Sequence, residues 1–374
     1  MRSLKFPLFL VACVGLGAAG AVGAGCGAGA GDDGLDGSGG ADGNTDNSSA
    51  NGFTDGAGAG STGSGPQCTD PSCIGGGQQG NCDQTLAIDS SDAMDGARAI
   101  GLCQVASGSS WGVVSAEWVR SDGQPLVGGD GGLFGDGTDL PSGKGILDHF
   151  GGGISPREGS KLLGLSSGTA RNPTDPGYAD VGSDWKDSNP HGAPAGYPKE
   201  SPSCPGVTTG EPYDSAGLRL VVKTPTDAKS LAFDFDFYTY EFPTYICSPY
   251  NDFFVAMMSP TPAGLPDGNI SFDSQGNTIS VNAGFLQVCT AQNAGGKDFP
   301  CALGPNELSG TGFESHAATS WLTTTAPIES PGSEITLHFA IWDSGDGVLD
   351  STTLIDNFRF DVDENSVGTT PIPQ

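Results

Sequence analysis

The chain is poor in positive charge: 15 lysines and arginines face 44 aspartates and glutamates, which gives a formal net charge of −29 over 374 residues. Nucleic acids and anionic membrane surfaces attract basic proteins, so neither is an expected partner. A surplus of acid accompanies calcium in many extracellular β-proteins, but it also keeps an ordinary surface protein soluble. Composition alone leaves both explanations open.

Histidine is equally scarce, so zinc chemistry is not expected. The four histidines never approach the H-x-x-x-H spacing with which one helix presents two imidazoles to zinc; they are His149, His191, His316 and His338. The chain also lacks the repeated C-x-x-C pairs that build structural zinc sites.

Long runs of helix-forming residues are missing too. Gly (62) and Pro (26) make up nearly a quarter of the chain, which favours short strands joined by turns. One short helix is expected within residues 89–103, with Ser91 as its cap. Strands are expected at residues 111–119, 161–166, 218–222, 252–258, 269–272 and 278–282.

The clearest alternation lies where Leu231, Phe233, Phe235 and Phe237 alternate with other residues, which predicts a strand with one core face. Residues 128–153 are interpreted as a Gly/Asp loop, and residues 171–215 as a surface excursion held through Cys204. The expected fold is therefore all-β: an antiparallel, jelly-roll-like sandwich with long loops.

Residues 333–361 contain two further predicted strands around a turn with three carboxylates: Asp343, Asp346 and Asp350. Carboxylates this close together repel one another unless a cation lies among them, and hard oxygen ligands suit Ca²⁺. The turn is not an EF-hand, because its acids fall at positions 1, 4 and 8 and strands flank it. A solvated acidic hairpin turn is the alternative.

A calcium ion takes roughly six to eight oxygens, more than one short turn readily presents. Asn251 and Asp252 lie at the start of a predicted strand and Asp343 at the end of another. Antiparallel pairing or packing would bring them together at one end of the sandwich. We therefore expect Glu241, Asn251 and Asp252 to form the second contributing loop.

Residues 1–25 are expected to be an export signal, because Arg2 and Lys5 precede an apolar stretch rich in small residues. Losing these two positive charges would take the formal charge from −29 to −31. Two cysteines could accept a bacterial lipid anchor. Cys13 fits the lipobox letters but follows a short apolar run, whereas Cys26 follows a fuller one and directly precedes a hydrophilic stretch. Cys26 is preferred, and a simple signal cut after Ala24 remains open.

Residues 26–80 are expected to be a disordered tether, because Gly, Asp and Ser cannot bury enough apolar surface to offset the entropy of ordering. About 40 such residues span roughly 35 Å, enough to hold a domain clear of a membrane. The sandwich domain is expected at residues 81–364, with a flexible tail at 365–374. The implied location is the outer membrane or cell surface, or the exterior if no lipid is attached.

Eight cysteines remain in the mature chain, and an even set in an exported protein indicates disulfides. Proximity in the sequence favours the pairs Cys68–Cys73, Cys82–Cys103, Cys204–Cys247 and Cys289–Cys301. Only the last has a further argument, because it closes one short loop that contains glycine.

Five blocks of the C-terminal half carry a family resemblance: FYTYEFPTYI at 237–246, YNDFF at 250–254, GNI at 268–270, ISVN at 279–282 and AIWDSGDGVLDS at 340–351. With these blocks in order, residues 216–361 resemble the choice-of-anchor L domain of bacterial surface proteins. Residues 82–204, with ARAIGLC and WGVVSAEWVR, are similar to a cysteine-bearing extension of predicted myxobacterial lipoproteins.

The resemblance implies an exported β-rich module held at the cell surface, without catalytic chemistry. The family often has two successive acids where this chain has Tyr240 and Glu241, and another where it has Thr244. If those acids bind a cation, this loop supplies fewer charges here.

One catalytic pattern is present, at Gly164-Leu-Ser166-Ser-Gly168, which matches the G-x-S-x-G elbow of α/β-hydrolases. Residues 169–173 cannot form the helix that this elbow requires, and no α/β alternation surrounds it. Carboxylate pairs for glycoside cleavage could be drawn from so many acids that no pair is informative. No catalytic residue is therefore assigned.

The expected function is a cell-surface binding or structural module of the adhesion or matrix type. Its partners would be a membrane, through the lipid, and an extracellular glycan or matrix protein. The alternative is a carbohydrate-active enzyme or a glycan-binding accessory protein. An open groove lined by aromatics such as Trp111, Trp118 or Trp321 would favour that alternative.

The anchor can be tested by growth with labelled palmitate. The protein should carry the label, and Cys26→Ala should abolish it. A label that survives this change but is lost in Cys13→Ala would move the acceptor to Cys13, and an unlabelled wild-type protein would refute the lipid anchor.

Overall fold

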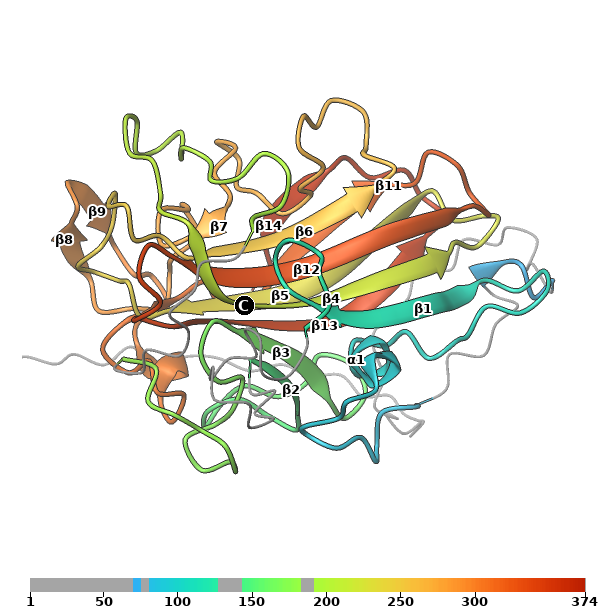
Figure 1. The fold of residues 1–374 in the computed structure, drawn as a ribbon, viewed down its shortest axis with the longest axis horizontal. Coiled ribbons are helices and arrows are strands. Elements are labelled where there is room, and N and C mark those ends of the chain that lie inside the picture. Colours follow the sequence, from blue (N-terminus) through green and yellow to red (C-terminus); the bar gives the residue numbers. More distant parts are fainter. Residues whose placement is uncertain (1–69, 75–80, 127–142, 183–191, 374) are drawn as a thin grey trace, which may run out of the picture. The chain divides into compact units, whose positions relative to one another are not determined.

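The computed structural model describes residues 70–74, 81–126, 143–182 and 192–373. Their strands form two main antiparallel sheets (Figure 1). The first sheet has the order β1 (Gly112–Val119), β4 (Pro212–Lys223), β12 (Glu334–Ser344), β6 (Phe253–Ser259) and β7 (Ile279–Ser280). The second has the order β14 (Gly368–Pro371), β11 (Leu322–Pro327), β5 (Ser230–Thr239), β13 (Ser351–Asp361), β3 (Leu162–Ser166) and β2 (Lys144–Leu147).

Three short strands lie outside these orders. β10 (Ala317–Ala318) pairs with β5, while β8 (Gln292–Ala294) and β9 (Lys297–Phe299) form a separate hairpin. The helices of the described residues are α1 (Ala93–Ala99) and the one-turn 3₁₀ helix η2 (Asn306–Leu308). None of the described helices is long and apolar enough to span a membrane.

Aromatic side chains join the two main sheets. Phe233 of β5 meets Phe339 of β12 with ring centroids 5.0 Å apart, and Phe235 of β5 meets Phe254 of β6 at the same distance. All four side chains are fully buried in one core. The predicted all-β antiparallel sandwich is therefore confirmed.

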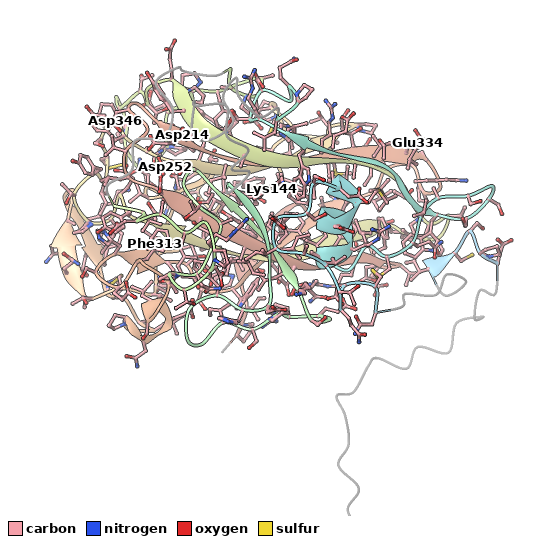
Figure 2. The ribbon with its side chains drawn as sticks, turned by 60° about the horizontal axis from the view of Figure 1, so that its bottom comes forward. Lys144, Asp214, Asp252, Phe313, Glu334 and Asp346 are labelled. Carbon is pink, nitrogen blue, oxygen red and sulfur yellow. A yellow bond between two sulfur atoms is a disulfide. The ribbon has the colours of Figure 1, made fainter. Side chains whose placement is uncertain are left out.

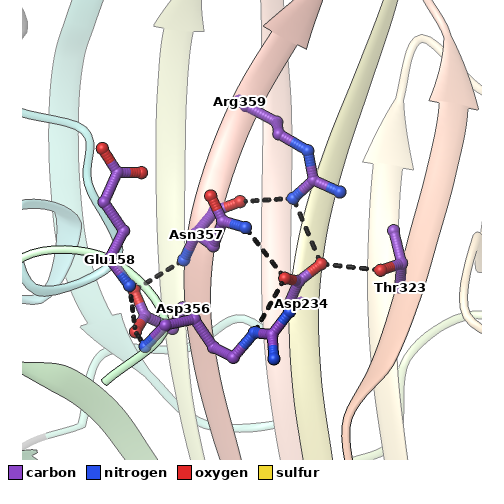
Figure 3. A network of polar contacts seen from close by, with 7 residues as sticks. Glu158, Asp234, Thr323, Asp356, Asn357 and Arg359 are labelled. Carbon is purple, nitrogen blue, oxygen red and sulfur yellow. Dashed lines mark hydrogen bonds and ion pairs between the residues drawn. The ribbon is translucent and has the colours of Figure 1, made fainter. Parts of the chain in front are cut away.

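The prediction that β5 has a single core face is wrong, because all ten of its residues are buried. The second face carries Asp234, whose carboxylate accepts hydrogen bonds from Arg359 at 3.1 Å, Thr323 at 2.7 Å and Asn357 at 2.8 Å (Figure 3). Arg157 adds an ion pair at 3.4 Å. The alternating sequence of β5 predicts that its second face is exposed to solvent. Polar side chains from neighbouring strands and a loop cover that face instead.

The helix differs from its prediction in length and cap. α1 is shorter than residues 89–103, and Asp92 caps it instead of Ser91, because the Asp92 carboxylate accepts the N–H of Met94 at 3.0 Å. Gly101 follows the helix with a φ of 94°, and its N–H donates to the carbonyl of Arg98. Glycine adopts this conformation without strain, which ends the helix there.

Two strands lie where loops were predicted. β2 occupies part of the predicted loop 128–153, because its four buried residues pair with β3. β14 occupies part of the predicted tail 365–374 and extends the second sheet beside β11. Conversely, residues 269–272 form no strand and make only isolated bridges.

Residues 70–74 of the predicted tether contact the sandwich. Thr226 donates its N–H to the carbonyl of Ser72 at 2.8 Å, and the indole of Trp111 donates to the carbonyl of Cys73 at 3.1 Å. The rest of the tether lies outside the described residues, as do the signal, Cys13 and Cys26.

Three predicted disulfides are present: Cys82–Cys103, Cys204–Cys247 and Cys289–Cys301. Cys73 is also disulfide-bonded, but its predicted partner Cys68 lies outside the described residues. Such a set of disulfides is typical of proteins that leave the reducing cytosol.

His338 is a half-buried group of the first sheet, and its ring nitrogen Nε2 donates to the carbonyl of Arg120 at 3.0 Å. Burial lowers the pKa of His338 to about 4 from 6.5, and Arg219 adds to the lowering, while the Arg120 carbonyl and Asp122 oppose it. The unfolded chain therefore binds this proton more readily than the folded chain does. The resulting stabilisation is complete above about pH 6.5 and is lost as the pH falls towards 4.

The variant His338→Gln keeps a donor but does not titrate. Between pH 6.5 and 4 its free energy of unfolding should fall less than that of the wild type, by up to roughly 3 kcal/mol. Denaturant unfolding at both pH values measures this difference. His149→Gln, which changes an exposed ring, is the control and should follow the wild type; equal pH slopes for all three proteins would contradict the prediction.

Candidate metal centre

The predicted acids of the first sheet lie where two paired strands end. Trp342 of β12 pairs with Phe253 of β6 in antiparallel register. The next residues outward are Asp343 and Asp252, so the register places them opposite each other. The alternating pattern thus positions two carboxylates on neighbouring strands.

The second sheet brings its own acids to the same place. Ser351 of β13 pairs with Thr239 of β5, and the N–H of Tyr240 donates to the carbonyl of Asp350 at 3.1 Å. Glu241 follows directly after this contact. The strand pairs of both sheets therefore end in acidic residues.

Three of these carboxylates form one cluster. Single carboxylate oxygens of Glu241, Asp252 and Asp343 lie within 4.8 Å of one another. The three side chains are at most 1% exposed, and the neighbouring Asn251 is fully buried. Figure 2 shows Asp252 at this end of the ribbon, with Asp346 from the turn after β12 labelled nearby. The structure thus brings together acids from both predicted loops.

The cluster has unmet hydrogen-bonding capacity. One oxygen of Glu241, one oxygen of Asp252 and both side-chain polar atoms of Asn251 are buried without a hydrogen-bond partner among the described residues. The other Asp252 oxygen accepts a long hydrogen bond, at 3.3 Å, from the N–H of Ser344. Neither Asp343 oxygen has a partner of good geometry, although the nearby backbone N–H groups of Gly347 and Val348 act to lower its pKa. Buried polar atoms in folded proteins are seldom left in this state.

Burial and mutual repulsion disfavour the charged forms of these acids. Burial, together with repulsion from Asp343, Asp346 and Asp350, raises the pKa of Glu241 to about 9. The pKa of Asp252 also lies well above its usual range, first through burial and then through Asp343 and Glu241. Burial, Asp346 and Asp350 likewise raise the pKa of Asp343. Without a cation the cluster must therefore take up protons or remain strained.

The donor set fits a hard divalent cation. Carboxylate and amide oxygens are the ligands that Ca²⁺ prefers, and sulfur and imidazole are absent from the described cluster. Asp346 is only partly buried, and burial raises its pKa too. Asp350 is fully buried and acts on the other acids through its charge. These two residues are further oxygen donors within electrostatic reach of the cluster.

One buried acid at this end of the first sheet was not predicted. Asp214 is 1% exposed and lies in an irregular part of β4, where Asp343 pairs with the preceding residue, Tyr213. Its φ of 47° lies in the left-handed region, which aspartate adopts more readily than most residues other than glycine. Asp214 falls within residues 171–215, which were predicted to be a surface loop. Its burial follows from β4 beginning at Pro212, earlier than the predicted strand at 218–222.

The G-x-S-x-G pattern does not form a nucleophile elbow. Ser166 ends β3 fully buried, and its hydroxyl donates to the carbonyl of Ser351 at 3.0 Å. The same oxygen accepts hydrogen bonds from the N–H of Gly168 and the hydroxyl of Thr352, both at 2.9 Å. This serine therefore links β3 to the start of β13, the strand that follows the acidic turn.

The three named tryptophans do not line an open groove in the described structure. Trp111 and Trp321 are buried, at 1% and 7% exposed. Trp118 lies under the ammonium of Lys144, which is 4.7 Å from its ring centroid. They act as packing residues.

No family model and no curated protein matches the chain. Among solved structures, the chain is similar to the K2 cleaved adhesin domain of Lys-gingipain, at 14% sequence identity and a TM-score of 0.25. The match covers 66% of this chain and 88% of that domain.

A glycine fixes the position of Asp350. A methyl group on Gly168 would overlap the Asp350 carboxylate, whereas one on Gly153 would meet nothing within 4 Å. Gly168→Ala should therefore destabilise the protein by about 1–3 kcal/mol, as overpacked cores do. Gly153→Ala is the matched control for the added methyl and should change the midpoint of denaturant unfolding little. Equal midpoints for the two variants would contradict the close approach of Asp350.

Proposed function

We propose that the protein is an exported, lipid-anchored binding module of the cell surface, whose loop end is held by a calcium ion. Glu241, Asp252 and Asp343 are the central ligands, and Asn251 supplies an amide oxygen. The proposal includes membership of the choice-of-anchor L family and an extracellular glycan or matrix protein as the partner. No catalytic role is assigned to any residue.

The observation that carries this proposal is the buried state of three carboxylates within 4.8 Å of one another with polar atoms left unpartnered. Burying isolated carboxylates is strongly unfavourable unless they are neutralised or bind a metal. In the described part of the chain, none of the three takes part in an ion pair. A divalent cation would supply the missing positive charge.

Such an ion would act as a clamp between the sheets. Glu241 follows β5 of the second sheet, whereas Asp252 and Asp343 belong to strand ends of the first. Binding to the folded chain alone would stabilise it by about 2.7 kcal/mol at a calcium concentration a hundredfold above Kd. The clamp would keep the loops of a surface module in one arrangement in the presence of extracellular calcium.

Thermal unfolding of the full-length protein tests the clamp. The melting temperature should rise with millimolar calcium and fall with a chelator. Asp343→Asn should lose most of this response and, because it removes one of several repelling charges, should melt higher than the wild type in chelator. Relative to the wild type, Asp343→Asn should therefore melt lower in calcium and higher in chelator. Replacing an ordinary core residue would lower the melting temperature in both conditions.

The exposed residue Asp363 provides the control, since Asp363→Asn changes the net charge equally. It should retain the full response to calcium. Melting that ignores both calcium and chelator, together with no metal by elemental analysis, would refute the calcium site and leave the cluster protonated.

A further inference from the structure

A second feature of the described structure is a cavity of about 380 Å³ beside the β8–β9 hairpin. Its volume falls within the range of small-molecule sites. Among the residues that line it are Ser203, Gln275, Asn282, Gln287, Lys297 and Phe299. They come from segments that are far apart in the sequence.

Two disulfides fix the walls of this cavity. Ser203 directly precedes Cys204, which is bonded to Cys247. Phe299 lies two residues before Cys301, which is bonded to Cys289. Disulfides restrict the loops that they close, so these loops hold one arrangement around the cavity. Because these loops are already ordered, a ligand can bind without the entropy cost of ordering them.

The lining is rich in donors and acceptors. The side-chain amide of Gln287 makes no hydrogen bond within the described residues, which leaves it available to a ligand. The hydroxyl of Ser203 accepts from Asn277 at 2.7 Å and donates to the amide oxygen of Gln275 at 3.3 Å, which leaves its second lone pair to accept from a ligand. Amides and hydroxyls of this kind match the hydroxyl groups of a sugar.

The cavity also holds a cation and an apolar wall. The ammonium of Lys297 donates one hydrogen bond to the carbonyl of Asn282 at 3.3 Å, and an ammonium has two further donors. Leu286 and Phe299 supply apolar surface. The exposed carboxylate of Asp298 also lines the cavity and can accept hydrogen bonds from sugar hydroxyls. The ammonium of Lys297 favours a ligand that also carries a carboxylate.

We propose that this cavity binds an acidic sugar, a uronic acid residue of an extracellular glycan. Lys297 pairs with the sugar carboxylate, Gln287 and Ser203 bind its hydroxyls, and Phe299 packs against its ring. This inference rests on the proposed function of a surface binding module and names the class of its ligand.

The cavity is connected to the acidic cluster. The N–H of Cys247 donates to the side-chain oxygen of Asn282 at 2.7 Å, and Asn282 lines the cavity. Cys247 lies between Glu241 and Asn251, so one segment joins the cavity wall to the proposed calcium ligands. Calcium at the cluster would thus hold the wall of the sugar site.

Isothermal titration calorimetry tests the proposal on full-length protein dialysed after loading with calcium. The probes are a disaccharide of galacturonic acid and the neutral disaccharide of galactose with the same linkage. The wild type should bind the acidic disaccharide at least tenfold more tightly than the neutral one. Lys297→Met should remove this preference, and Gln287→Leu should weaken binding of both sugars.

Lys223→Met is the matched control, because the ammonium of Lys223 also donates to a backbone carbonyl, that of Gly108, at 2.8 Å, and the change in charge is the same. It should bind both sugars as the wild type does. The proposal fails if the wild type binds neither sugar, binds both equally, or loses the acidic sugar equally in Lys223→Met. If calcium still raises the melting temperature in that case, the calcium-clamped module stands and only the ligand is wrong.

Discussion

Repulsion between carboxylates buried at one end of the sandwich is the constraint on which the rest of this structure depends. Glu241, Asp252 and Asp343 are buried where a charge is poorly solvated. Burial and the charges of neighbouring acids raise the pKa of all three. A fold can retain such a cluster only if something offsets its free energy. We propose that a hard cation does so, with the hydrophobic core keeping both sheets in register around the site.

The architecture explains why these acids meet. β12 lies between β4 and β6 in the first sheet, while β13 lies between β5 and β3 in the second. β12 and β13 are joined by the acidic turn, so one short connection links the centres of both sheets. Each side of the turn then faces a neighbouring strand end, with Asp252 on one side and the Tyr240–Glu241 step on the other. An ion bound at this point would contact both layers at once.

Most residues of the acidic cluster could be predicted from the sequence, but several features of the surrounding sheets could not. Asp343 and Asp252 follow from acids beside alternating strands, because antiparallel pairing determines which residues lie opposite each other. Alternation does not predict that both faces of β5 are buried, because an aspartate such as Asp234 is normally exposed to solvent. Here its carboxylate is covered by Arg359 and Thr323, which come from other strands. β2 and β14 were missed because their glycine and threonine residues resemble loops when taken alone. Only pairing with β3 and β11 makes them strands.

The order of strands also determines when the chain can fold. Leu220 of β4 pairs with Leu337 of β12, and Phe235 of β5 pairs with Ile355 of β13, in each case more than a hundred residues later in the sequence. Both sheets therefore lack a central strand until the C-terminal part of the chain is present. Non-local pairing of this kind slows folding, because long loops must close before any contact stabilises them. If the chain is exported as we propose, its N-terminal half therefore stays unfolded until the last strands are made, and an unfolded chain can be threaded through a membrane.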